Sequence, residues 1–214
     1  MKFLPLLLLF IGAVAHADDP DTPLTLNGCL IAESSQCPGA NLRGAHLANQ
    51  DLRKMNLAGA DLRDADLRHA RLDLANLEKA QLQGANLSRA SLQQSNLRLA
   101  DFSDATLKAI QGWGLFAQGA QFQRADLTAA YLQFARLSGA RLHDANLQAA
   151  DLEMAWLSKA DLKGADLRDA NLQEVKLGES NLERANLTGS RQHYGNFQDA
   201  NMQGCVGCPT SWKQ

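Results

Sequence analysis

The sequence predicts an all-β solenoid, in which short extended segments wind into stacked coils around one narrow apolar core. Three observations support this fold class. The chain repeats every five residues from Ala40 to Met202 without a change of frame, leucine dominates one position of the repeat, and alanine dominates the position two residues earlier. The other positions are mostly polar, with Asn or Asp frequent between the Ala and the Leu.

The five-residue period decides between helix and strand. There are 33 units with centres at Leu42, Leu47 and so on to Met202; the centre is Leu in 26 units, and Ala stands two residues before it in 24. This period fits neither an α-helix nor a coiled coil, which would smear these leucines around the helix surface. In an extended segment, side chains two apart point the same way. The Ala and the Leu therefore point inward, and stacked coils bury what a single unit cannot.

The repeated pattern Ala-[Asp/Asn]-Leu-x-x, seen in Ala60-Asp-Leu-Arg-Asp64, resembles the pentapeptide-repeat family over residues 40–204. The resemblance implies a right-handed quadrilateral β-helix with four units, or about 20 residues, per coil and about eight coils in all. At a strand spacing of ~4.8 Å, the rod is on the order of 40 Å long.

The N-terminal residues are typical of an export signal. Lys2 is followed by an apolar run from Phe3 to Val14 and by Ala15-His16-Ala17, an A-x-A cleavage site. The alternative is a buried N-terminal helix. We expect a signal peptide at 1–17, an N-terminal cap at 18–39, the solenoid at 40–204 and a C-terminal cap at 205–214. Cleavage would leave no membrane anchor and place the protein in the periplasm or outside the cell of a bacterium.

Four cysteines lie just outside the repeats, as the pairs Cys29/Cys37 and Cys205/Cys208. The solenoid implied by the resemblance separates the two pairs by its length, so within one chain a disulfide can form only inside each pair. We predict both disulfides, as staples of the two caps. Cys205-Val-Gly-Cys208 also has the C-x-x-C spacing of redox and metal sites, which leaves a thiol-redox or metal-binding protein as an alternative.

The repeat breaks between Gln111 and Ala120, where the centres are Gly112 and Ala117. Two interpretations are open. In a repacked coil, the larger Phe102 and Phe122 fill the space that these small centres leave. In a bulged loop, Gly112 and Gly114 act as hinges and present Trp113 to a partner.

Large apolar residues recur on one predicted side of the rod when the sequence is arranged in columns of 20. Trp113, Tyr131, Phe134 and Met154 share that side, and Trp156 is placed at the next corner. Exposed aromatic and Met clusters are enriched in interfaces. We predict that these five residues bind a protein partner or a second copy of the chain.

No catalytic, cofactor-binding or metal-binding constellation stands out in the sequence. The protein is therefore expected to be a non-enzymatic scaffold without a cofactor. With 21 Lys and Arg against 23 Asp and Glu, it has neither the basic excess of a nucleic-acid binder nor the acidic excess of a DNA mimic. We expect no nucleic-acid partner. The alternative from the same family, a gyrase-protecting DNA mimic, is disfavoured by this charge balance and by the export signal.

Overall fold

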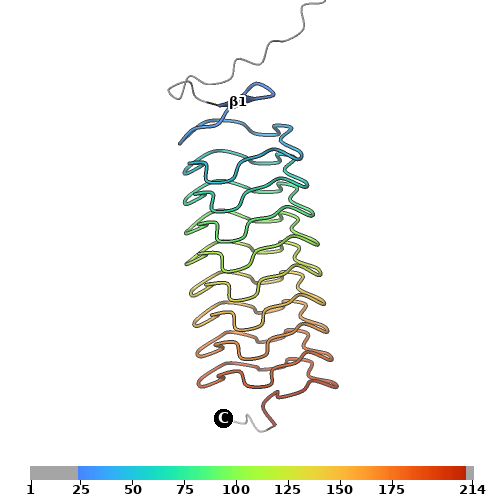
Figure 1. Cartoon of the computed structure of the whole chain (residues 1–214). Helices are drawn as coiled ribbons and strands as arrows, with labels where there is room; N and C mark the ends of the chain where they lie inside the picture. The colour runs from blue at the N-terminus through green and yellow to red at the C-terminus, as the bar shows by residue number, and fades with distance from the viewer. Residues whose placement is uncertain (1–23, 211–214) are drawn as a thin grey trace, which may run out of the picture.

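The protein forms one rod of stacked coils in a computed structural model that describes residues 24–210 (Figure 1). At the N-terminal end, strands β1 (Thr25–Leu26) and β2 (Cys29–Leu30) make an antiparallel hairpin. The predicted signal peptide at 1–17 and the outermost parts of both predicted caps lie outside the described residues. Within the described part, no helix is long and apolar enough to cross a membrane.

Single parallel bridges join each coil to the next. Every fifth residue from Gln36 to Asn186 pairs with the residue 20 positions later, ending with the pair Asn186↔Val206. Four bridges therefore fall in each 20-residue coil, one on each side of a square. The predicted fold class is confirmed: the chain is an all-β, right-handed quadrilateral β-helix. We name a side of the rod after one bridged residue on it, so that the Gln111 side is followed along the chain by the Phe116 side.

The core is a column of leucines lined by alanines. Leu62, Leu82 and Leu142 lie in one column, and each has 0% of its surface exposed. The residue two before the centre, usually Ala, is also buried; Met55 and Val175 take this position in two coils and are buried as well. Burying each leucine contributes about 1.5–3 kcal/mol, which is the main favourable energy of the stack.

A tight turn follows each centre and makes the corner of the square. At the first corner of the repeat, Ala45 donates a hydrogen bond from its backbone nitrogen to the Leu42 carbonyl at 3.0 Å, and Gly44 has a φ of 64°. A positive φ at the third residue of such a turn defines type II, in which glycine is favoured. Most corners of this chain nevertheless carry Asp, Lys, Arg or other side chains at that position.

The frequent Asn or Asp before each centre has a structural cause that the repeat pattern alone does not reveal. Its side chain accepts a hydrogen bond from the backbone N–H two residues later, as in Arg63 to Asp61 at 3.2 Å and Ala58 to Asn56 at 3.2 Å. Without this bond, the first N–H of the turn has no backbone partner among the hydrogen bonds of the coil. The short acceptor side chain thus caps the corner in the units that carry Asn or Asp before the centre.

Acid is expected to weaken the rod through a subset of these capping residues. Asp51, Asp61 and Asp66 each accept hydrogen bonds from the arginine two residues later, which lowers the pKa of each carboxyl from 3.8 to about 2. A carboxyl with a lower pKa in the folded state stabilises the fold above its unfolded pKa, and that stabilisation is lost as the pH falls toward the folded value. The urea midpoint should therefore drop between about pH 4 and about pH 2.

The variant Arg63→Gln tests this explanation, because the hydrogen bond from the Arg63 side chain is the largest cause of the lowered pKa of Asp61. Its urea midpoint should fall less steeply with acid than that of the wild type. The effect per pair is modest because these side chains are partly exposed. Parallel acid profiles for the two proteins would contradict the assignment.

The break at 111–120 is a repacked coil, and the bulged-loop interpretation is wrong. Gln111 and Phe116 keep their bridges to both neighbouring coils, so the backbone follows the repeat without interruption. Inside, Phe102 and Phe122 stack with ring centroids 5.0 Å apart, and Leu115 lies in the space left by Gly112. Because the larger residues compensate for the small centres, no loop needs to bulge outward.

Candidate interaction surface

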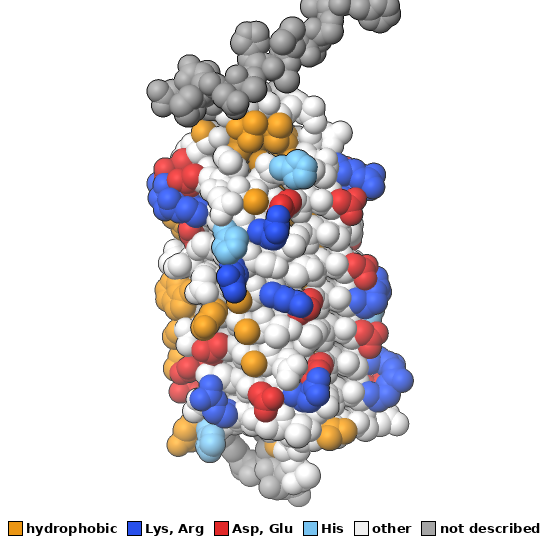
Figure 2. Space-filling view, viewed as in Figure 1, with side chains coloured by type: hydrophobic (Ala, Val, Ile, Leu, Met, Phe, Trp, Pro, Cys, Tyr) orange, Lys and Arg blue, Asp and Glu red, His pale blue; other side chains and the backbone are white. Residues whose placement is uncertain are grey.

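The five residues predicted as an interface lie close together near the middle of the rod, and we call them the aromatic patch: Trp113, Tyr131, Phe134, Met154 and Trp156. Trp113 and Phe134 touch, with ring centroids 5.9 Å apart and planes tilted by 57°. About half of the surface of each aromatic residue is exposed, from 44% to 52%, whereas Met154 is half-buried. Figure 2 shows hydrophobic side chains gathered at one edge of the rod near its mid-length.

The patch wraps a corner instead of lying on one side. Trp113, Phe134 and Met154 stand at turns, and Tyr131 lies on the Gln111 side. The sequence-based placement of Trp156 at a corner is wrong, because Trp156 is bridged to Arg136 and lies in the middle of the Phe116 side. Arranging the sequence in columns of 20 correctly predicted which residues lie above one another in successive coils. It did not show which position of the five-residue unit forms the corner.

A stack of cations and rings was missed by the sequence analysis. On the Phe116 side, the Arg98 and Arg136 guanidinium carbons lie 5.1 and 5.0 Å from the Phe116 ring centroid. Arg136 also lies 5.6 Å from the Trp156 ring, so the order along the rod is ring, cation, ring. The signal was present as the 20-residue spacing of residues 116, 136 and 156. Such contacts contribute about 0.5–1 kcal/mol each at exposed sites.

The same column has a different chemistry nearer the N-terminus. Asn56, Asn76 and Asn96 each donate from the side-chain amide to the residue one coil earlier, at 3.2, 3.2 and 3.0 Å. This amide ladder closes the column without exposing apolar surface. It ends at Phe116, where the rings begin. The rod therefore does not need aromatic residues to stack this column, which favours a role for them in binding.

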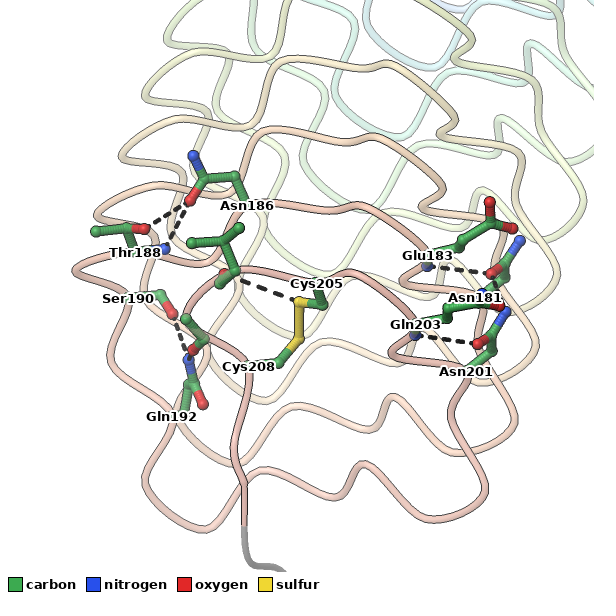
Figure 3. Close-up of a disulfide and its surroundings, with 12 residues drawn as sticks. Asn181, Glu183, Asn186, Thr188, Ser190, Gln192, Asn201, Gln203, Cys205 and Cys208 are labelled. Atoms are coloured by element: carbon green, nitrogen blue, oxygen red, sulfur yellow. Dashed lines mark hydrogen bonds between the residues drawn. A yellow bond between two sulfur atoms is a disulfide. The ribbon is translucent and has the colours of Figure 1, made fainter.

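Both predicted disulfides are present. Cys29 and Cys37 have Cα atoms 5.5 Å apart, and Cys205 and Cys208 have Cα atoms 5.8 Å apart. The second bond lies at the C-terminal end of the rod, beside the last coil (Figure 3). There Gln192 occupies a centre position and donates hydrogen bonds to Ser190 and to the Gly207 carbonyl, both at 2.8 Å. The polar side chain and the disulfide together cover the end of the core.

A second feature of the Gln111 side is a hollow of about 350 Å³ nearer the N-terminus. Its lining includes Arg53, Lys54 and Arg71. Arg53 and Lys54 pair with Glu33 at 3.1 and 2.8 Å, so the cations are held in place by their own chain. Across the residues that the structure describes, no three His, Cys, Asp or Glu side chains are grouped as a metal site would require.

Comparison with known proteins gives the same repeat. A family model described as pentapeptide repeats matches eight copies, over residues 40–78, 80–109, 125–164 and 165–205. The unmatched residues 110–124 contain the repacked coil. A comparison with curated proteins finds no match.

Solved structures of similar chains are also found. HetL, a pentapeptide repeat protein involved in heterocyst differentiation regulation in the cyanobacterium Nostoc sp. strain PCC 7120, is 30% identical, with 81% of this chain and 87% of that chain covered and a TM-score of 0.43. A trypsin-treated variant of QnrB1, a plasmid-mediated fluoroquinolone resistance protein, is 19% identical, with 79% and 89% covered and a TM-score of 0.48.

Proposed function

We propose, from the premise that the chain belongs to the pentapeptide-repeat family, that it is an exported, non-enzymatic scaffold that binds a protein through the aromatic patch. Members of this family are generally structural or interaction proteins, which supports the non-enzymatic part of the proposal. Export is supported by the signal-like residues 1–17 and by the two cysteine pairs, since disulfides persist in oxidising compartments.

The observation that carries the binding role is the local change of surface chemistry. The positions that hold Trp113 and Trp156 hold Gln, Asn, Glu or other polar residues in most other coils, and the position of Phe134 is polar in about half of them. Their exposed rings add nothing to the core, which is complete without them. Exposed Trp, Tyr and Phe, with Arg beside them, are the residues that contribute most to protein interfaces.

The aromatic patch can be tested with the mature protein as bait in an envelope fraction. Trp113→Ser combined with Phe134→Ser should remove both touching rings and lower the yield of a specific partner at least tenfold, because such residues contribute ~2 kcal/mol or more each. Leu99→Ser is the matched control, since Leu99 is equally exposed, at 52%, but belongs to another corner.

The folded state of each variant is checked by its circular dichroism spectrum and thermal midpoint. The control should retain the partner. Equal recovery by the wild type and by the double variant, both folded, would show that the aromatic patch is not the binding site.

A further inference from the structure

The Gln111 side of the rod is divided by charge. We compare three columns of residues on this side, each in steps of 20. The central column contains the bridged residues from Asp51 to Asn171, and the two edge columns contain turn residues, from Asn49 to Asp169 and from Arg53 to Gln173. Toward the N-terminus these columns hold the cations Arg53, Arg71 and Arg89 with His69, against the anions Asp51 and Asp73. Toward the C-terminus they hold three carboxylates and no Lys or Arg before Arg191.

These three carboxylates, Asp151, Glu153 and Asp169, have no ion-pair partner among the described residues. Asp151 instead accepts hydrogen bonds from the amides of Gln133 and Asn171, each at 2.9 Å. Asp151 and Glu153 therefore place negative charge directly beside Tyr131 and Met154 of the aromatic patch. Asp169 lies on the other edge of this side, where it interacts electrostatically with Arg168. At the other end of the same side lies the hollow lined by Arg53, Lys54 and Arg71.

A strip of small apolar residues runs along the edge of this side that lies opposite Trp113. Ala109, Ala129 and Ala149 have φ angles of 52°, 54° and 55°, and they are the only alanines with positive φ in the part of the chain that the structure describes. An L-residue in this conformation costs on the order of 1 kcal/mol, which glycine would avoid. The three methyl groups thus form a flat apolar strip along one edge of the Gln111 side, and Trp113 stands at the other edge.

We propose that a second copy of this chain covers the Gln111 side in antiparallel orientation, with a two-fold axis through Gln111. This inference rests on the proposed function and names the partner. Rotation about that axis exchanges the two ends and the two edges of the side, as an isologous interface requires. It sets Asp151 against Arg71 of the second copy, and Trp113 against Ala109 of the second copy.

Two further pairs agree with this register. Glu153 faces His69 of the second copy, and Asp169 reaches the hollow beside Arg53 of the second copy. A parallel arrangement would instead set Asp51, Arg71 and Asp151 of the central column each against its own copy, which is destabilising. Because the side is narrow, the contact is smaller than the ~800 Å² per partner of a standard interface, and we expect a dimer that forms reversibly with concentration.

Sedimentation of the mature protein over a range of concentrations tests this proposal. The wild type should change from monomer to dimer, and Asp151→Lys or Arg71→Glu should each raise the dissociation constant at least tenfold. Mixing these two variants should restore a heterodimer, because each altered charge then faces its complement. Asp161→Lys is the control: Asp161 lies on the opposite side and accepts from Asn181 at 3.0 Å, as Asp151 does from Asn171.

Orientation is tested by oxidative cross-linking of single-cysteine variants, since all four native cysteines are in disulfides. Gln111→Cys lies on the axis and should join to its own copy. Arg191→Cys lies four coils away on the same side, so its mate would be on the order of 40 Å distant and should not join. A parallel dimer would cross-link both variants, which would overturn the proposal.

These experiments distinguish failure of the proposed dimer from failure of the proposed binding role of the aromatic patch. If the wild type stays monomeric at every concentration, the second copy is the wrong partner. Loss of another captured protein from the Trp113→Ser, Phe134→Ser variant would in that case still support the proposed function. If the protein neither dimerises nor loses a partner in that variant, both proposals are wrong.

Discussion

Replacing Gly112 by leucine is expected to destabilise the rod by about 1–3 kcal/mol, although leucine is the usual residue at this position of the repeat. A Cβ atom at Gly112 would already lie 2.6 Å from the Leu115 side chain and 3.0 Å from that of Leu132. The added leucine therefore has no space in this coil. Urea unfolding followed by circular dichroism measures the loss.

The compensating change is Leu115→Ala. Alone it should cost about 2–5 kcal/mol, because it leaves a cavity next to a glycine. Combined with Gly112→Leu it restores the usual Ala and Leu positions, so the double variant should be more stable than either single variant. Simple addition of the two single losses would show that the two sites do not share one space and that the coil is packed in another way.

Replacing Gly207 by alanine should open the C-terminal coil. Gly207 has a φ of 74°, and a Cβ atom there would lie 2.7 Å from the Thr188 nitrogen and 2.8 Å from the Leu187 carbonyl carbon. These are backbone atoms of the preceding coil and cannot move aside as a side chain can. We expect the hydrogen bonds between Leu187 and Val206 and between Val206 and Ala185 to break, with amide exchange at both donors at least tenfold faster.

Gly139→Ala is the matched control for Gly207→Ala. Its φ of 67° is similar, but a Cβ atom at Gly139 meets nothing within 4 Å. This control should cost only the ~1 kcal/mol of placing an L-residue in the left-handed region. Equal acceleration of exchange at Leu187 and Val206 in both variants would show that conformation, and not the backbone contact, decides the effect.

The architecture could be predicted from the sequence because every repeat unit buries side chains at the same two positions. An inward Ala and Leu at a strict period leave few ways to bury both, so the core positions followed from the repeat itself, whereas the coil length of 20 residues came from the resemblance to the pentapeptide-repeat family. The two disulfides followed as well, since the length of the rod leaves each cysteine only one partner. The side-chain hydrogen bonds that residues such as Asn56 and Asp61 accept at the corners explain why Asn or Asp so often precedes the central Leu, which the period alone did not explain.

The details of the surface could not be predicted in the same way. The period shows which side chains lie above one another, but the corner is set by the turn type, so Trp156 was placed at a corner when it lies on a flat side. The contacts of Phe116 with Arg98 and Arg136 depend on side-chain orientation, which the repeat does not fix. The choice between a bulge and a repacked coil depended on whether Leu115 could occupy the space beside Gly112, and this is a question of volume in three dimensions.

The constant 20-residue step from one bridged residue to the next has a consequence for how such rods change in length. Inserting or removing five residues would turn every later side chain by a quarter of a circle, from the Gln111 side to its neighbour. Adding a whole coil would leave all directions unchanged and only increase the distance between two features. The number of whole coils therefore sets the position of a residue along the rod, and the number of additional five-residue units sets the side on which it lies. A binding surface can be shifted along the rod by whole coils without changing the side that it faces.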